Sequence, residues 1–197
     1  MELLLRISSF IDRLTTWVGR YAMWLVLAAV LVSSSNAIIR KTFNMSSNAF
    51  LEMQWYLFSA VFLLCAPYAL LKNEHVRIDV VSGRFSARSR VWMELIGTLL
   101  FLLPISCVIL LFSWHVFLTA LHSGEVSPND GGLFLWPARL LVPAGFLLLI
   151  LQGLSQAIKC GSFLFDHGDD PLKKEKKMTA EEELAESIRL QRQRQGA

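Results

Sequence analysis

The side chains that commonly do chemistry are few in this sequence, and they form no recognisable motif. Three cysteines and four histidines are scattered without paired or metal-ligand spacing: Cys65, Cys107, Cys160, His75, His115, His122 and His167. An odd number of unpatterned cysteines predicts no disulfide framework. The sequence also contains no glycine-rich phosphate loop, no nucleophile elbow and no HExxH pattern. We therefore expect a chain that is not an enzyme and that uses no metal and no cofactor.

Two ionisable residues stand out because they lie within long apolar stretches. Glu52 follows the start of one such stretch by about one turn, and Arg139 lies one to two turns into another. A charge at membrane depth is costly unless it is paired or close to an interface. We therefore predict structural roles for Glu52 and Arg139, in contact with each other, with a lipid headgroup or with a partner protein. We expect Glu94 in the first turn of its helix, where an acid complements the helix dipole.

The apolar stretches themselves predict an all-α integral membrane protein. The chain has 197 residues, of which 54% are hydrophobic, and its mean hydropathy is +0.46. Runs of roughly 20 apolar residues favour transmembrane helices, because a helix pairs its own backbone groups in lipid. The predicted spans are about 17–39, 49–71, 91–117 and 134–158. They give a four-helix transmembrane domain over 1–160, with Pro137 in a first helical turn and a small polar patch at 33–36 suited to helix packing.

The residues before the first span predict an amphipathic helix. Apolar residues recur there at helical spacing: Leu3, Leu4, Ile7, Phe10, Ile11, Leu14 and Trp17. One interpretation is an N-terminal interfacial helix that lies among the lipid headgroups. The alternative is that these residues extend the first span as one long tilted helix.

The distribution of lysine and arginine predicts the orientation in the membrane. Three such residues precede the first span, two lie in the first loop, five in the second loop and none in the third. The positive-inside rule then places the N-terminus, the second loop and the C-terminus in the cytoplasm. The net charge of +3 is explained by topology and by contact with membrane phospholipid, so we expect no nucleic acid partner. The charged cytoplasmic tail, 161–197, contains a possible capping box at Thr179 and Glu182.

Two segments together resemble the DctQ family, the small membrane subunit of tripartite ATP-independent periplasmic (TRAP) transporters. In the segment LEMQWYLFSAVFLLCAPYALLKNEHVRIDVV, Glu52 opens a span, and His75, Arg77 and Asp79 follow it with hydrophobic residues between them. The later segment GEVSPNDGGLFLWPARLLVPAGF contains a Glu-x-Ser loop, Trp136 followed by proline, and a Pro-x-Gly-Phe sequence. The resemblance extends over about 17–159, in the right order and with four spans.

The resemblance implies a small permease subunit in the bacterial inner membrane. Its partners would be a large membrane subunit with the elevator and sodium sites, and a periplasmic solute-binding protein that delivers organic anions of the carboxylate type. The small subunit would scaffold the large one and help to dock the binding protein, with Glu52, His75, Arg77, Asp79, Trp136 and Arg139 as structural, partner or lipid contacts. The alternative function is a stand-alone homo-oligomeric membrane transporter or channel, which would require an acid near the middle of a span.

Overall fold

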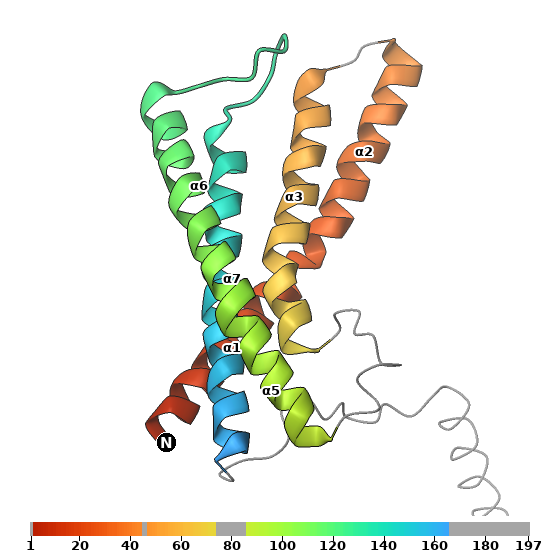
Figure 1. The fold of residues 1–197 in the computed structure, drawn as a ribbon. Coiled ribbons are helices and arrows are strands. Elements are labelled where there is room, and N and C mark those ends of the chain that lie inside the picture. The colour runs from red at the N-terminus through yellow and green to blue at the C-terminus, as the bar shows by residue number, and fades with distance from the viewer. Residues whose placement is uncertain (1, 45–46, 74–85, 166–197) are drawn as a thin grey trace, which may run out of the picture.

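The computed structural model describes residues 2–44, 47–73 and 86–165, and over these residues the chain is a bundle of long helices (Figure 1). In chain order the elements are α1 (Glu2–Ala22), α2 (Trp24–Phe43), α3 (Asn48–Leu71), α5 (Ala87–Gly97), the π-helical turn η1 (Thr98–Leu102), α6 (Leu103–Ser123) and α7 (Trp136–Leu164). Four continuous stretches are long and apolar enough to cross a membrane: 3–43, 48–71, 87–123 and 136–164. The predicted all-α fold with four transmembrane helices is confirmed.

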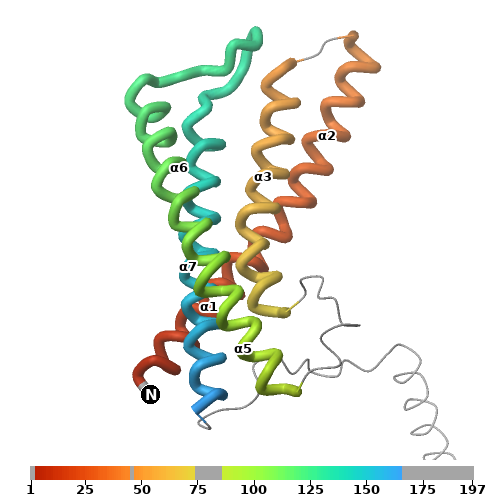
Figure 2. The backbone as a smooth tube through the Cα atoms, viewed as in Figure 1, coloured from red at the N-terminus to blue at the C-terminus, as the bar shows by residue number. Residues whose placement is uncertain are grey.

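The helices form two arms that diverge toward one end of the molecule. Helices α6 and α7 pack along each other as one arm, and α2 and α3 form the other, as Figure 2 shows. The arms meet where α3 packs on α7, and there α1 crosses and contacts both. The α6–α7 connection, the end of α2 and the beginning of α3 therefore lie at the divergent end, which we call the open end.

The bundle is apolar on the outside and partly polar within. Its exposed residues include many large apolar side chains, such as Phe58, Phe62, Leu111 and Phe112, whereas small and polar residues of α7 are buried. In lipid, apolar burial does not drive helices together, so close backbone approach and hydrogen bonds must do so. Glycines permit two close approaches, because a Cβ on Gly19 would lie 2.7 Å from Tyr68 Cβ and one on Gly145 would lie 2.9 Å from Leu63 Cβ.

A short turn at Met23 separates α1 from α2. The Met23 N–H still donates to the Gly19 carbonyl at 3.2 Å, but a new helix begins at Trp24. The structure thus has two helices joined at Met23, and whether α1 lies among the lipid headgroups or extends the first span stays a prediction. The buried face of α1 carries Ser8, Ile11, Thr15, Gly19 and Ala22.

Hydrogen bonds and one ion pair join α1 to α7. Asp12 Oδ1 accepts from the Ser155 hydroxyl at 2.8 Å and from the Gln152 amide at 3.2 Å, while Asp12 Oδ2 lies 2.6 Å from Lys159 Nζ. One turn earlier in α1, the hydroxyls of Ser8 and Ser155 are 2.7 Å apart. We call these five residues the polar seam. It fixes α1 against α7 by directional contacts.

The third transmembrane stretch differs from the prediction at its beginning. Helix α5 begins at Ala87, where the Ser86 side chain accepts a hydrogen bond from the Ser89 N–H at 3.3 Å. Glu94 therefore lies about two turns into the helix, and the prediction that it complements the dipole in the first turn is wrong. Further along, the wider π-helical turn η1 ends two residues before Pro104, which has no N–H to donate and needs space near the preceding carbonyls.

The close approach at Gly145 generates a stability prediction. A Cβ there would also lie 3.0 Å from the Leu63 carbonyl oxygen, and backbone atoms cannot turn aside as a flexible side-chain end can. Gly145→Ala should therefore destabilise the α3–α7 contact by about 1–3 kcal/mol. The higher helix propensity of alanine offsets part of this loss. The measurement is the thermal midpoint of the purified protein in detergent.

Gly97→Ala is the matched control, because a Cβ at Gly97 meets no atom within 4 Å. This variant should keep or raise the midpoint, since alanine is favoured over glycine inside a helix. Equal midpoints for the two variants would contradict the packing account.

Candidate functional site

The loop between α6 and α7, residues 124–135, is bound by one side of α3 at the open end of the bundle. Asn48, Glu52 and Tyr56 follow one another at intervals of four residues and therefore lie along one face of that helix. The Asn48 amide donates to the Asp130 carbonyl at 3.1 Å, and the Tyr56 hydroxyl donates to the Phe134 carbonyl at 3.1 Å. Glu52, between them, makes the central contacts.

The Glu52 carboxylate is 5% exposed and accepts three hydrogen bonds from the loop. The Ser127 hydroxyl and the Asn129 amide, the latter at 2.9 Å, both donate to Oε1. The backbone N–H of Leu133 donates to Oε2 at 2.7 Å. We call this arrangement the Glu52 site. A buried carboxylate requires such donors, because an unpaired charge removed from water is very costly.

Hydrogen bonds within the loop hold it in a conformation in which its donor groups face Glu52. The Ser127 N–H donates to the Leu133 carbonyl at 2.9 Å, and the Leu135 N–H donates to the Glu125 carbonyl at 3.0 Å, so the two sides of the loop are paired. Gly132 lies so close to Ser127 that a Cβ on it would approach the Ser127 Cβ to 2.5 Å. Glycine at this position therefore allows Ser127 and Leu133 to face the same carboxylate.

Arg139 pairs with Glu125 and not with Glu52, the partner that its place in the sequence first suggested. Its guanidinium makes a two-point contact with Glu125, with Nη1–Oε2 at 2.5 Å and Nη2–Oε1 at 2.8 Å. Both side chains are partly exposed. A direct Glu52–Arg139 pair is not formed, because each charge is satisfied by another group of the loop. The two residues instead bind the same loop, Glu52 from α3 and Arg139 from the first turn of α7.

The remaining predicted residues are only partly described by the structure. Trp136 is the first residue of α7 and is partly exposed, and Pro137 follows it in the first helical turn, as predicted. His75, Arg77 and Asp79 lie outside the described residues, as does the possible capping box at Thr179.

Sequence reasoning missed the loop residues that satisfy the two charges. Depth within a span identified Glu52 and Arg139 as residues needing partners, but depth says nothing of a loop that folds back over the helix. The Glu-x-Ser sequence that formed part of the family resemblance contains Glu125 and Ser127. The sequence therefore marked these two residues, but it did not show which charges they contact.

The contacts of Glu52 and Arg139 favour a structural site over an ion-binding one. The three donors on Glu52 and the two-point contact of Arg139 leave neither charge as an open ligand. Among residues 2–44, 47–73 and 86–165, no three histidine, cysteine, aspartate or glutamate side chains gather closely enough to hold a metal ion. The arrangement holds the loop in place across the open end.

Substitutions at Glu52 should separate hydrogen bonding from charge. In Glu52→Gln the amide oxygen can accept from Leu133, and the amide nitrogen can then donate to Ser127 and to a turned Asn129 side chain. Glu52→Leu removes every acceptor and leaves buried donors unpaired. We expect thermal stability in detergent, and protection of the loop from proteolysis, to fall in the order wild type, Glu52→Gln, Glu52→Leu.

A double-substitution cycle provides the control for a direct ion pair. Glu125→Gln and Arg139→Gln should be coupled, by up to about 1 kcal/mol, because the pair is partly exposed. Glu52→Gln and Arg139→Gln should instead be nearly additive. If the second pair proved as strongly coupled as the first, the assignment of separate partners would be wrong.

Comparison with known proteins assigns the sequence to a transporter family. The family model described as "Tripartite ATP-independent periplasmic transporters, DctQ component" matches residues 29–160, which extend from α2 to near the end of α7 and include the Glu52 site. No curated protein and no solved structure matches the chain. Because the family model covers more than half of the 197 residues, the chain belongs to the DctQ family, the small membrane component of TRAP transporters.

Proposed function

We propose that this small permease subunit scaffolds the large TRAP membrane subunit and helps to dock the periplasmic solute-binding protein. The observation that carries the proposal is the 124–135 loop, which two separate sets of contacts hold across the open end of the bundle. A loop fixed in this way offers a preformed docking surface, which lowers the entropic cost of binding a partner. The transport step itself, sodium-coupled uptake of organic anions of the carboxylate type, belongs to the complete complex.

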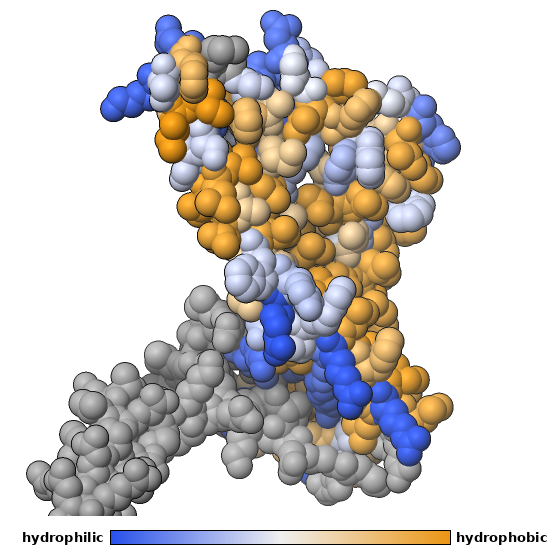
Figure 3. All heavy atoms as spheres, turned by 180° about the vertical axis from the view of Figure 1, so that it is seen from behind, coloured by the Kyte–Doolittle hydropathy of each residue, from blue (hydrophilic) through white to orange (hydrophobic). Residues whose placement is uncertain are grey.

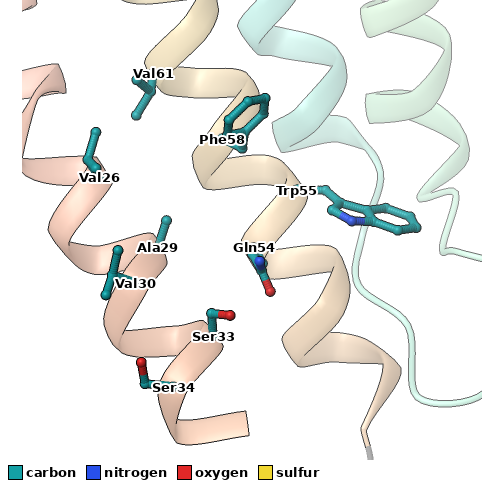
Figure 4. A pocket seen from close by; sticks show the side chains of 9 residues that line it. All are labelled: Val26, Ala29, Val30, Ser33, Ser34, Gln54, Trp55, Phe58 and Val61. Atoms are coloured by element: carbon teal, nitrogen blue, oxygen red, sulfur yellow. The ribbon is translucent and has the colours of Figure 1, made fainter. Parts of the chain in front are cut away.

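A groove between α2 and α3 supports the scaffold role. It encloses about 380 Å³ and is lined by Val26, Ala29, Val30, Ser33 and Ser34 of α2 and by Gln54, Trp55, Phe58 and Val61 of α3. Figure 4 shows Ser33 and Gln54 across from each other within this mostly apolar lining. Small residues and a few hydrogen-bonding groups are what helix association in lipid uses. The groove therefore fits a transmembrane helix of the large subunit.

The described charges argue against independent transport. Glu52 and Arg139 lie near the open end, and Asp12 and Lys159 belong to the polar seam, where each has a partner. A self-sufficient secondary transporter commonly has broken helices or ionisable residues near the membrane centre. A stand-alone homo-oligomeric transporter remains the competing outcome of the transport experiment below.

The orientation can be tested by labelling single cysteines in intact cells. The background variant replaces Cys65, Cys107 and Cys160 with alanine. By the positive-inside rule, cysteines introduced at Ser46 and Asp130 should react with a membrane-impermeant thiol reagent from the periplasm. Cysteines at Ser86 and Thr179 should react only after the inner membrane is opened. Periplasmic labelling at Thr179 would contradict the proposed cytoplasmic C-terminus.

The transport proposal predicts that activity requires all three proteins. Reconstituted alone, the chain should carry no sodium-dependent flux of organic anions, because Glu52, Arg139, Asp12 and Lys159 already have partners. Reconstitution with the large subunit and the binding protein should restore uptake driven by a sodium gradient. The measurement is accumulation of radiolabelled carboxylate in proteoliposomes, with an equal potassium gradient as the control. Sodium-dependent uptake by the isolated chain would establish the stand-alone alternative instead.

A further inference from the structure

Helix α1 has a row of three arginines that neither the family match nor the proposed function explains. The match begins at residue 29, after this helix ends. Arg6, Arg13 and Arg20 are spaced by seven residues, and a helix drifts by only about 20° in seven residues. The three side chains therefore share one face, and all three are exposed. We call them the arginine stripe.

No described carboxylate neutralises the arginine stripe. The ion pairs among the described residues join Arg139 to Glu125 and Lys159 to Asp12. Asp12, in the middle of α1, points into the polar seam and is used there. Within the part of the chain that the structure describes, the stripe therefore presents uncompensated positive charge outward.

The face beside the arginine stripe is strongly apolar and also exposed. Leu3, Phe10 and Trp17 are 71%, 68% and 61% exposed, and the rings of Trp17 and Tyr21 lie 4.8 Å apart. Tryptophan and tyrosine are enriched where a membrane meets water. The view from behind in Figure 3 shows hydrophilic side chains gathered beside apolar ones over the lower part of the bundle, where α1 crosses.

A shallow hollow lies on the surface between the first two arginines. It encloses about 420 Å³ and is lined by Leu5, Arg6, Ser9, Phe10 and Arg13. The Ser9 hydroxyl donates to the Leu5 carbonyl at 2.9 Å, so the two guanidinium groups supply the outward donors. Paired guanidinium groups suit a phosphate, and Leu5 and Phe10 provide apolar contact beside it.

We propose that the hollow between Arg6 and Arg13 binds the headgroup phosphate of an anionic phospholipid. The acyl chains then lie against the apolar face of α1, and Arg20 extends the attraction along the stripe. This combination of positive charge with a large exposed apolar face distinguishes a lipid from a soluble phosphate, which needs no apolar surface. The site belongs to α1, so it is independent of the proposed docking and scaffold roles.

The test is equilibrium binding of fluorescent phosphatidylglycerol to the full chain in a non-ionic detergent. Arg6→Gln with Arg13→Gln should weaken binding by about tenfold to thirtyfold, the size expected for two basic residues at an anionic membrane surface. The matched control is Arg40→Gln with Lys41→Gln, which removes the same charge from the last turn of α2. That control should change affinity less than twofold. Arg6→Lys with Arg13→Lys should retain most of the binding.

Three results would overturn the proposal. Equal weakening by both double glutamine variants would indicate nonspecific attraction by net charge. Displacement of the lipid by millimolar glycerol phosphate would indicate a site for a soluble anion. Loss of lipid binding when the large subunit is present would indicate that the arginine stripe contacts that subunit and not a lipid.

Discussion

The need of one buried carboxylate for hydrogen-bond donors organises the open end of this molecule. Glu52 lies in α3, and every donor that reaches it comes from the 124–135 loop, which is attached to α6 and α7. Toward this end the two helical arms diverge (Figure 1). The hydrogen bonds of Glu52, with those of Asn48 and Tyr56 on either side, connect α3 to the loop of the other arm there. Removal of the carboxylate would leave three donors facing an apolar helix.

The opposite end uses the same principle with different groups. Asp12 has the role there that Glu52 has at the open end. Gln152 and Ser155 of α7 donate hydrogen bonds to its carboxylate, and Lys159 forms an ion pair with it. In lipid, apolar side chains gain little by leaving the lipid tails to contact one another, so specific contacts between helices depend on small residues and hydrogen bonds. Both acids serve as anchors between elements far apart in the sequence. This role accounts for two of the buried or partly buried acids of the bundle without a cluster of metal-ligating side chains among the described residues.

The sequence predicted the elements of this fold better than the contacts between them. Long apolar runs identified the four transmembrane helices, because their length and hydropathy are local properties. Glu52 and Arg139 were recognised as charges in need of partners, but a position along a helix gives depth and not the identity of a neighbour. That Glu125 and Ser127 contact these charges could be found only from the folded loop, whose shape depends on Gly132 and on pairing between its two sides. Glu94 was misplaced because α5 begins at Ala87, several residues before the apolar run.

Helix α1 shows why an amphipathic pattern alone does not determine packing. The sequence gives an apolar face and a polar face, and in a soluble protein the apolar face would pack inward. Here Ser8 and Asp12 face α7, and Gly19 allows α1 to approach Tyr68, while Phe10 and Trp17 face outward. Turning the helix to bury Phe10 would break the ion pair with Lys159 and would turn Gly19, which lets α1 approach Tyr68, away from α3. The polar seam therefore fixes the rotation of α1, and this rotation leaves its apolar face exposed.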